Sequence, residues 1–368
     1  MYYDVMKILF DARESGTSTG RYMDKLVEYL YKEDPGLKLE VLTRKNRLDY
    51  IRSIAPGYGV MEAEFKEFTF DEQLGFKKLI KSRNPDLVHF GMIQQPILYR
   101  GKVVTTMHDL TTARFTNPDK NPVVFKIKQV VYKVVIRVAA KKSVKIITPT
   151  QYVKDDLVDF AKISPDKVVV TPESADKISD PALEMPGLKG RRFIMYIGRP
   201  TPHKNLERLI DAFAEILETQ PDLKLVLAGK KDANYSRIED GVEPKLKDSI
   251  VFTDFISEGQ LRWLYENCQA YVFPSLSEGF GLPGLEAMIH GAPVVSSNAT
   301  CLPEVYGDAA AYFDPLDTES MASTINKVLT DAAYRNTLIA KGHAQAAKYS
   351  WRRMAQQTLS VYKEVLGK

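Results

Sequence analysis

The sequence is poor in cysteine, has no long apolar run and carries no strong surplus of either charge. Two cysteines, Cys268 and Cys301, stand among 368 residues, which gives neither a disulfide framework nor the spacing of a thiolate metal site. The most apolar region, between residues 123 and 138, is cut by lysines and an arginine, so it falls short of the ~20 apolar residues that cross a bilayer. The first residues also lack the pattern of a signal peptide. These absences predict a protein of the reducing cytoplasm.

Other common patterns are missing as well. No G-x-G-x-x-G motif follows the first expected strand, which argues against a dinucleotide site. A pI near 8.7 without an aromatic-basic module argues against nucleic acid as a partner. The net charge is only +4, and residues 1–185 hold 30 basic and 25 acidic side chains. This small positive surplus is compatible with a mildly anionic partner of the first half of the chain, or with no charged partner at all.

The sequence does contain short apolar runs that alternate with amphipathic segments, which is the pattern of parallel sheets covered by helices on both faces. A chain of 368 residues is also too long for one ordinary core. We therefore predict an α/β protein with two doubly wound domains, residues 1–185 and 186–350, joined by a Pro- and Gly-containing linker at 181–192. The expected strands are 7–10, 39–42, 87–90, 103–107, 144–148, 168–171, 193–197, 224–228, 250–252, 270–273 and 293–297. The expected helices are 21–31, 76–82, 123–141, 151–160, 206–217, 258–267, 285–290, 318–330, 332–348 and 351–365, the first capped by Ser18 or Thr19.

The chain is organised around residues 274–288, where a buried strand runs into a glycine-rich loop and then a helix. The helix is closed by Gly291. Pro283 suits its first position, where a missing N–H has no consequence. The N–H groups at such a helix start, with the positive end of the helix dipole, predict an anion site.

Two carboxylates, Glu278 and Glu286, bracket this loop with seven residues between them. A carboxylate beside a phosphate would repel it, so these side chains are expected to face uncharged parts of a ligand, such as sugar hydroxyls. Each charge-assisted hydrogen bond of that kind contributes roughly 1.5–3 kcal/mol. The alternative from spacing alone is a Gly/Pro turn whose glutamates are solvated.

Three further polar loops follow expected strands: residues 15–20, residues 108–109 and residues 198–205. Ligands of doubly wound sheets bind outside the carboxyl ends of the strands, so all of these loops lie on the binding side. In the last loop, Arg199 and Lys204 could supply two positive charges to a diphosphate, or they are solvated loop charges. A single histidine such as His108 more often packs in the core or caps a helix than takes part in catalysis.

The segment from Glu278 to Glu286 resembles the E-x7-E signature of retaining glycosyltransferase family 4. The resemblance spans nearly the whole chain and is dense from 196 to 315, with the arginine-lysine loop and the His-Asp pair in the family's order. It implies the GT-B fold, in which two Rossmann-like domains hold the active site between them. It also implies that the last helix, residues 351–368, crosses back to complete the first domain.

The resemblance assigns roles in the second half of the chain. Gly198, Arg199 and Lys204 match the segment that holds the donor diphosphate in the family. Glu286 would bind the nucleotide ribose and Glu278 the transferred sugar. The loop residues that would bind the donor, the first three of them through backbone N–H groups, are Gly279, Phe280, Gly281 and Leu282.

In the first half, His108 would contact the 6-hydroxyl of the transferred sugar or shape the reaction centre, and Asp109 would orient its loop. Family members often have Gly-x-Gly-Arg-Tyr where this chain has Ser18-Thr19-Gly20-Arg21-Tyr22, with a further glycine at Gly16. Gly16, Ser18 and Gly20 are expected to bind substrate, although Ser18 crowds a phosphate more than glycine would. A second departure is Glu-Ser-Ala-Asp at 173–176, where relatives tend to have Asn-Gly-Val-Asp.

Residues 120–145 contain eight lysines and arginines and no acidic residue, interleaved with valine and isoleucine. A basic amphipathic helix of this kind can lie on an anionic bilayer. A helix packed on a sheet with a solvated lysine face gives a similar pattern, and we favour that interpretation.

Together these features predict a retaining hexosyltransferase of polysaccharide or glycolipid biosynthesis. It would transfer a mannosyl or glucosyl unit from a UDP- or GDP-sugar to a glycan or lipid-linked acceptor, without a metal ion or other cofactor. Contact with an anionic membrane at its inner face is a further expectation. The alternatives are a sugar-nucleotide epimerase and a non-catalytic nucleotide-sugar binding protein.

Overall fold

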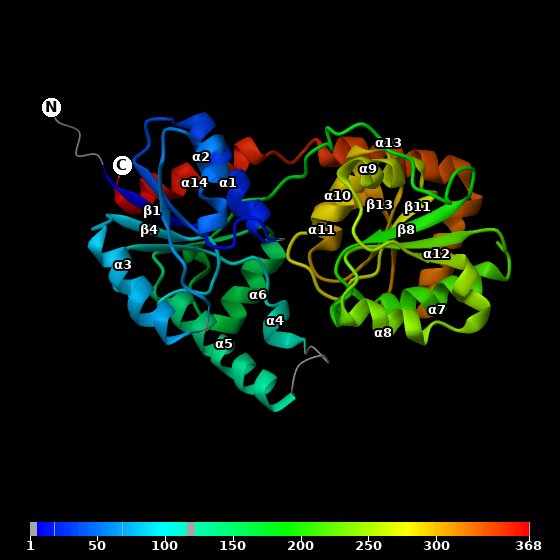
Figure 1. Cartoon of the computed structure of the whole chain (residues 1–368), viewed down its shortest axis with the longest axis horizontal. Helices are drawn as coiled ribbons and strands as arrows, with labels where there is room; N and C mark the ends of the chain where they lie inside the picture. Colours follow the sequence, from blue (N-terminus) through cyan, green and yellow to red (C-terminus); the bar gives the residue numbers. More distant parts are fainter. Residues whose placement is uncertain (1–5, 18, 68, 116–121, 368) are drawn as a thin grey trace. The chain divides into compact units, whose positions relative to one another are not determined.

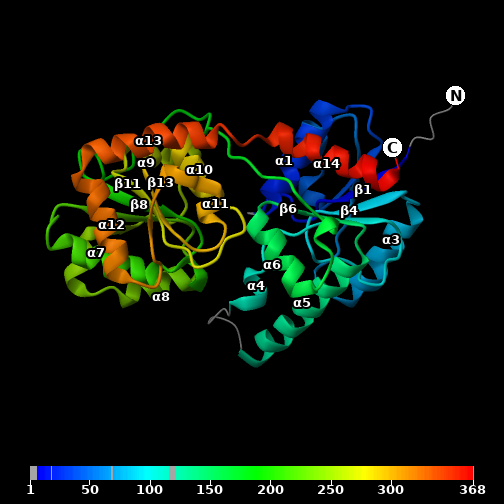
Figure 2. The same cartoon turned by 180° about the vertical axis from the view of Figure 1, so that it is seen from behind.

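The computed structural model describes residues 6–17, 19–67, 69–115 and 122–367, which form two compact units (Figures 1 and 2). The first unit comprises the residues up to Ala113, Lys126–Glu173 and the stretch from Ser350 onward. The second comprises Arg114–Phe125 and Ser174–Tyr349. Each unit is built around one parallel sheet, and the fold class predicted from the sequence is confirmed.

The first unit contains a seven-stranded parallel sheet in the order β3-β2-β1-β4-β5-β6-β7. Its strands are β1 (Ile8–Asp11), β2 (Leu39–Thr43), β3 (Gly59–Glu62), β4 (Leu87–Phe90), β5 (Val103–Thr106), β6 (Lys145–Thr148) and β7 (Val168–Val170). Ile8 of β1 is in register with Leu39 of β2 on one side and with Leu87 of β4 on the other. The winding therefore reverses between β1 and β4, and the crevice beyond their carboxyl ends is where such a sheet binds ligands.

Helices and shorter turns connect these strands and cover the sheet. They are α1 (Gly20–Glu33), η1 (Lys45–Arg47), α2 (Leu48–Ile54), η2 (Glu72–Phe76), α3 (Lys77–Ser82), α4 (Thr111–Arg114), α5 (Pro122–Lys142), α6 (Gln151–Ala161), η3 (Pro165–Lys167) and α14 (Trp351–Leu366). α1 begins one residue before the predicted start, and its cap differs from the prediction. Thr19 makes no capping hydrogen bond; instead the hydroxyl of Thr17 accepts one from Gly20 N at 3.0 Å. Ser18 lies outside the described residues.

α5 packs on the sheet with one face, as the favoured interpretation of the basic segment predicts. Tyr132, Ile136 and Ala139 of this helix join the core that contains Ile146 of β6. The opposite face carries exposed lysines, as predicted, but also exposed apolar side chains. Within the described ranges, neither α5 nor any other helix is long and apolar enough to cross a bilayer.

α14 is the last helix of the chain, yet it packs against α1 in the first unit. Arg352 and Gln356 of α14 both bond to Glu33 at the end of α1. Its inner face also reaches the sheet, where the Tyr362 hydroxyl lies 2.6 Å from Nδ1 of the buried His89. The C-terminal segment is thus an integral part of the first unit.

The second unit contains a six-stranded parallel sheet in the order β10-β9-β8-β11-β12-β13. Its strands are β8 (Phe193–Ile197), β9 (Lys224–Ala228), β10 (Ile250–Phe252), β11 (Ala270–Phe273), β12 (Val294–Ser297) and β13 (Ala310–Phe313). The helices and turns are η4 (Pro202–Lys204), α7 (Leu206–Leu217), α8 (Ala233–Gly241), η5 (Pro244–Ser249), α9 (Glu258–Asn267), α10 (Leu282–Ile289), α11 (Leu302–Tyr306), η6 (Gly307–Ala309), α12 (Thr318–Thr330) and α13 (Ala332–Ala346). Here the winding reverses between β8 and β11, so the loops after these two strands share the binding edge.

Several elements were not predicted from the sequence. β3 is a half-exposed edge strand, and its sequence Gly-Val-Met-Glu lacks a continuous apolar run. β13 reads Ala-Ala-Tyr-Phe and has little of the β-branched character that marks a strand. Both pair with a neighbouring strand of their sheet, so tertiary pairing rather than local preference makes them strands.

Candidate active site

The glycine-rich loop of the second unit leads from β11 into α10, as predicted. Gly281 precedes the helix with φ 92°, and Gly291 follows it with φ 78°. Pro283 occupies the second helical position rather than the first, since α10 begins at Leu282. Tyr306 packs under the loop and its hydroxyl donates to Gly281 O at 2.5 Å. A Cβ at Gly284 would lie 2.3 Å from that hydroxyl, so this glycine is required for the loop to approach Tyr306.

Lys204 and Glu278 are brought together by the reversal point of the second sheet. Nζ of Lys204, at the end of η4, lies 2.5 Å from Oε1 of Glu278 in the loop after β11. Both side chains are less than one-fifth exposed, and Nζ lies 5.5 Å from the centroid of the Phe273 ring. The lysine predicted to bind phosphate and the carboxylate predicted to bind sugar therefore form one partly buried ion pair.

Asn205 fastens the two loops to each other. Its Nδ2 donates to the carbonyl oxygens of Pro274, at 3.1 Å, and of Pro315, at 2.7 Å. Leu276 N also donates to His203 O at 2.7 Å. Asn205 adopts a left-handed conformation with φ 61°, which asparagine tolerates better than most residues. This contribution of Asn205 to the site was not foreseen from the sequence.

Glu286 lies in α10 and is buried, with 8% of its surface exposed. Its Oε2 accepts a hydrogen bond from the Tyr265 hydroxyl of α9 at 3.3 Å. The Tyr265 ring stacks on His290, whose Nδ1 in turn bonds to Glu286 O at 2.8 Å. The carboxylate is therefore held in one orientation by its neighbours, and a small part of it remains accessible.

Arg199 follows Gly198 directly after β8, but its guanidinium extends into solvent. Nε donates to Asp232 Oδ2 at 3.0 Å while 73% of the arginine side chain is exposed. Burial alone would raise the pKa of Asp232, but the hydrogen bonds from Arg199 and from the backbone of Tyr235 and Asn234, together with the charge of Arg199, outweigh it, and the pKa lies below its usual range. A pocket of about 560 Å³ lies beside this loop, between Thr201, Arg208 and Arg237. Lys204, Glu278 and Glu286 are not among its lining residues.

In the first unit, His108 follows β5 and is held by two acceptors. Nε2 bonds to Gly91 O at 3.0 Å, just beyond β4, and Nδ1 lies 3.3 Å from Oε1 of Glu173. Burial alone would lower the pKa of His108, but the hydrogen bond to Glu173 and the charge of that carboxylate raise it overall. The structure therefore favours the imidazolium form. Glu173 was noted in the sequence only as a departure from the family pattern.

A small pocket of about 120 Å³ opens beside His108. Asp109 lines it and accepts a hydrogen bond from Thr111 N at 2.7 Å, which fixes the start of α4. Gln94 and Tyr132 are further lining residues. Asp109 thus orients its loop in the first unit in the manner expected from the sequence.

The glycines of the loop after β1 are explained by close contacts within the first unit. Gly16 has φ 83°, and a Cβ at Gly20 would lie 1.9 Å from Glu14 O. The loop is packed on its own residues: the Ser15 hydroxyl bonds to Asp24 at 2.5 Å, and Arg47 bonds to both of them at 2.9 Å. Contact of Gly16, Ser18 or Gly20 with a substrate stays a prediction.

A buried chain of hydrogen bonds runs from α14 to the neighbourhood of His108. It passes from Tyr362 to His89 at 2.6 Å, from His89 to Thr106 at 2.8 Å and from Thr106 to Tyr22 at 2.9 Å. The Tyr22 ring meets the His108 ring edge to face, with centroids 4.8 Å apart. Burial lowers the pKa of His89 to about 3, so this histidine is neutral. No local pattern in the sequence indicated the role of His89, because its partners are distant along the chain.

Comparison with known proteins identifies the family. The glycosyltransferase family 4 model matches residues 19–177, and the model of glycosyl transferases group 1 matches residues 184–345. O-antigen chain mannosyltransferase B of Escherichia coli is 31% identical over 71% of this chain and 70% of its own length. The chain belongs to glycosyltransferase family 4.

Another relative of this glycosyltransferase is the serotype-specific mannosyltransferase WbdA of Escherichia coli. It is 34% identical over 59% of this chain, a match that spans only 28% of WbdA. Among solved structures, sucrose-phosphate synthase from Thermosynechococcus elongatus matches with a TM-score of 0.78 at 18% identity, over 98% of this chain and 99% of that one. HepE of Anabaena, solved with UDP and glucose, matches with a TM-score of 0.74 at 17% identity, over 98% and 100% of the two chains. These likenesses confirm the expectation of a GT-B fold.

Proposed function

We propose that this glycosyltransferase is a retaining enzyme that moves a mannosyl unit from a UDP- or GDP-linked donor to a hydroxyl of a glycan or lipid-linked acceptor. The observation that carries the proposal is the ion pair of Lys204 and Glu278 at the reversal point of the second sheet. It sets a cation for phosphate and an acceptor for sugar hydroxyls side by side, next to the start of α10. The choice of mannose and of a glycan acceptor is supported by the O-antigen mannosyltransferases among the relatives.

Donor binding would divide the ion pair between two parts of the ligand. The diphosphate takes the ammonium of Lys204 and the backbone N–H groups at the start of α10, where the helix dipole favours an anion. The carboxylate of Glu278 is then released to accept hydroxyls of the sugar. When the bond between sugar and phosphate breaks, negative charge grows on the leaving diphosphate. The cation already in place stabilises that charge more strongly than it stabilises the ground state.

The first unit would supply the acceptor side of the reaction. Glu173 favours the charged form of His108, whose Nε2 would exchange its bond to Gly91 O for one to a hydroxyl of the transferred sugar. The acceptor hydroxyl attacks on the face that the diphosphate leaves, and the departing phosphate takes its proton. The configuration at the anomeric carbon is thereby retained.

We also propose that transfer needs no metal ion, because Lys204 and Arg199 supply positive charge to the diphosphate. The reaction would take place in the cytoplasm, at the inner face of the membrane that presents the lipid-linked acceptor. Gly16, Ser18 and Gly20 would contact the donor from the first unit.

The decisive experiment is the release of nucleoside diphosphate from UDP-, GDP- and ADP-sugars, with and without a lipid and glycan extract, in the presence of EDTA. Release from one donor that the extract enhances, with an α-linked product from an α-linked donor by NMR, is the expected result. A changed sugar without transfer would instead indicate an epimerase. Tight donor binding without turnover would indicate a non-catalytic binding protein. Activity that EDTA abolishes and a divalent cation restores would refute metal independence.

A further inference from the structure

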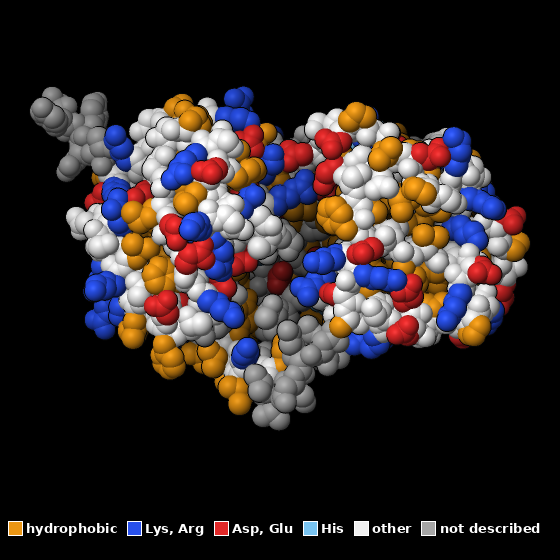
Figure 3. Space-filling model, viewed as in Figure 1, with side chains coloured by type: hydrophobic (Ala, Val, Ile, Leu, Met, Phe, Trp, Pro, Cys, Tyr) orange, Lys and Arg blue, Asp and Glu red, His pale blue; other side chains and the backbone are white. Residues whose placement is uncertain are grey.

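An exposed apolar surface in the first unit is left unexplained by the donor and acceptor sites. Seven large apolar side chains are 48% to 89% exposed there, and we call them the apolar patch: Phe70, Leu74, Leu98, Ile127, Val130, Val131 and Val134. Four of them come from α5, and the others come from η2, the residue shortly before it and the loop between β4 and β5. Figure 3 shows hydrophobic side chains along the lower edge of this unit, over α3 and α5.

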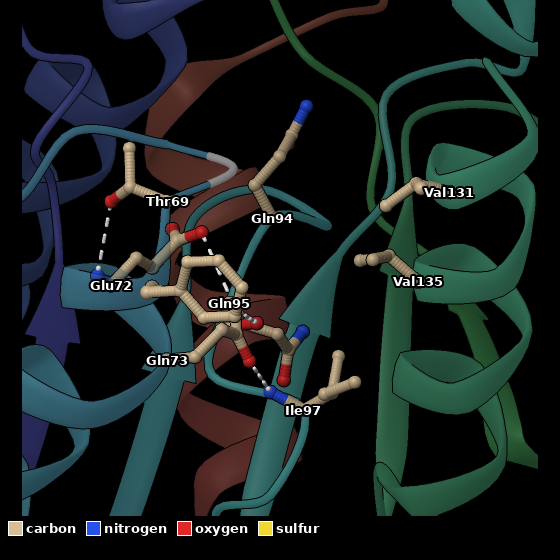
Figure 4. A pocket seen from close by; sticks show the side chains of 9 residues that line it. Thr69, Glu72, Gln73, Gln94, Gln95, Ile97, Val131 and Val135 are labelled. Carbon is tan, nitrogen blue, oxygen red and sulfur yellow. Dashed lines mark hydrogen bonds between the residues drawn. The ribbon is translucent and has the colours of Figure 1, made fainter. Parts of the chain in front are cut away.

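A pocket of about 230 Å³ lies within the patch. Val131 and Val135 point into it from α5, and Gln73 and Ile97 line it opposite them (Figure 4). The volume is below the ~300–1,000 Å³ of sites for drug-sized ligands. It fits a slender group rather than a ring system with several substituents.

Three polar side chains of this pocket are held by hydrogen bonds to other groups of the protein. Gln73 Nε2 donates to Gln95 O at 3.2 Å, while Gln73 Oε1 accepts from Ile97 N at 2.9 Å. Gln95 Nε2 donates to Thr105 at 3.0 Å, and Glu72 accepts from Arg13 at 3.0 Å. Gln95 Oε1 has no hydrogen-bond partner within the described part of the chain. This oxygen is buried, however, so a ligand in the pocket cannot donate a hydrogen bond to it. The accessible lining is therefore mostly carbon, which suits hydrocarbon and not a sugar or a phosphate.

The charge around the patch favours one kind of partner. α5 carries six lysines and arginines and no acidic side chain over residues 122–142. Lys126, Lys128, Arg137 and Lys141 of this helix are exposed, as are Lys78 and Lys81 of α3. Basic side chains around apolar ones are complementary to an anionic bilayer, which attracts the cations at its surface and takes the apolar groups below the headgroups.

The pocket in the patch also adjoins the pocket beside His108, because Gln94 lines both of them. A molecule with a polar head at His108 could therefore place an attached hydrocarbon segment between Val131 and Ile97. We propose that the apolar patch docks the first unit on an anionic lipid bilayer and that its pocket binds a hydrocarbon chain of the acceptor lipid. The assignment of that chain to an acceptor rests on the proposed transferase function, whereas docking on the bilayer does not.

The docking surface is tested with a fluorescent probe at Val131. A Val131→Cys variant can be labelled selectively, because Cys268 and Cys301 are buried. An environment-sensitive dye at this position should shift to the blue with vesicles rich in phosphatidylglycerol and not with pure phosphatidylcholine. The matched control is Val144→Cys, which is 43% exposed in the same unit but outside the patch. Silence at both positions, or equal shifts at both, would overturn the docking proposal.

Two pairs of variants separate apolar insertion from charge attraction. Phe70→Ser combined with Leu74→Ser should weaken co-sedimentation with the anionic vesicles at least about tenfold, while Leu316→Ser, 65% exposed in the second unit, leaves it unchanged. Lys126→Glu combined with Lys128→Glu should weaken it at low salt, while Lys189→Glu should not. Unchanged partition of both double variants refutes the proposal. The proposal is also refuted if the protein does not bind the vesicles but forms a dimer by itself, and if the Phe70→Ser and Leu74→Ser changes dissociate that dimer.

The pocket is tested with cis-parinaric acid, a fluorescent hydrocarbon probe. Val131→Trp and Ile97→Trp fill the pocket from opposite walls and retain apolar surface, so both should bind the vesicles normally but bind the probe at least about tenfold more weakly. Probe binding equal to that of the unaltered protein in both variants excludes the pocket. Hydrolysis of the donor by water serves as the second readout. If the protein hydrolyses the donor but binds neither the probe nor the vesicles, only this inference fails. If it binds lipid but does not turn over any donor, the proposed transferase function fails.

Discussion

Both units hold a cation against a carboxylate beyond the carboxyl ends of their strands, but the two pairs differ in kind. In the second unit Lys204 and Glu278 lie 2.5 Å apart and unite two full charges. In the first unit His108 and Glu173 lie 3.3 Å apart, and the strength of this pair depends on a proton that histidine can lose near neutral pH. Under the proposed function, the donor diphosphate would meet a fixed positive charge and the acceptor side a titratable one.

The largest expected effect comes from breaking the fixed pair. Lys204→Ala should lower kcat/KM for the nucleotide-sugar donor about a hundredfold, because one preorganised positive group opposite the leaving group is lost. Steady-state kinetics with a saturating acceptor measure this change. Lys189→Ala, which removes an exposed lysine paired with Glu184 in the same unit, should have no effect. Wild-type kinetics in Lys204→Ala would remove Lys204 from the donor site.

A smaller loss is expected at the second carboxylate of the glycine-rich loop. Glu286→Ala should weaken use of the donor by at least about tenfold, or 1.4 kcal/mol, because the hydrogen bonds from the ribose diol are lost. Kinetics with the donor as the varied substrate should show the loss mainly in KM. Glu258→Ala in α9, an exposed glutamate, is the control. An unchanged donor KM would mean that Glu286 serves only to hold Tyr265.

His108 packs against the buried chain of hydrogen bonds that begins at Tyr362 of α14. No such chain is found among the contacts of Lys204 within the described residues. Tyr362→Phe removes the hydroxyl that lies 2.6 Å from Nδ1 of His89. It leaves a buried polar atom without its partner, at a cost of about 1–3 kcal/mol. Differential scanning calorimetry should show a lower Tm for the first unit, while Tyr50→Phe on its surface should leave Tm unaltered. Equal Tm values for both variants would contradict a structural role of the hydrogen-bonded chain.

The smallest expected effect is the pH dependence of the titratable pair. The folded-state pKa of His108 is raised above the ordinary ~6.5, so the stability from this pair is complete below that value and is lost as pH rises through the raised pKa. Glu173→Gln should therefore lower the free energy of unfolding by about 1 kcal/mol near pH 6 and by less near pH 9. Chemical unfolding at the two pH values measures the difference, with the exposed pair variant Asp159→Asn as control. A penalty that grows with pH would reverse the sign of the argument.

The elements with a clear local signal could be predicted from the sequence. α7 buries Leu206, Leu209 and Phe213 along one face and leaves its polar residues outside, which is the helical period that the sequence displays. α5 shows the limit of that inference. Its valines and isoleucines extend beyond the face that the sheet covers: Val135 and Ile136 are buried, whereas Ile127 and Val130 are exposed. Which of them remain exposed depends on the neighbours of the helix.

The candidate site divides in the same way. The loop from Glu278 to Glu286 and the loop with Arg199 and Lys204 could be predicted, because glycine, proline and charge mark them locally. Glu173 and His89 were not assigned a role, since each acts through a partner brought close by the sheet. Arg199 was predicted as a phosphate ligand, and the structure places its guanidinium on Asp232. Its contact with a diphosphate stays a prediction.

Two parallel sheets and the polar loops at the carboxyl ends of their strands could be predicted from the sequence, because apolar runs and turn residues act over a few neighbours. Which side chains meet depends on the folding of each unit as a whole. Lys204 and Glu278 are 74 residues apart, His108 and Glu173 are 65 apart, and His89 and Tyr362 are 273 apart. These contacts depend on strand order and on the docking of α14, which are settled by burial of apolar surface throughout each unit and not by any local pattern.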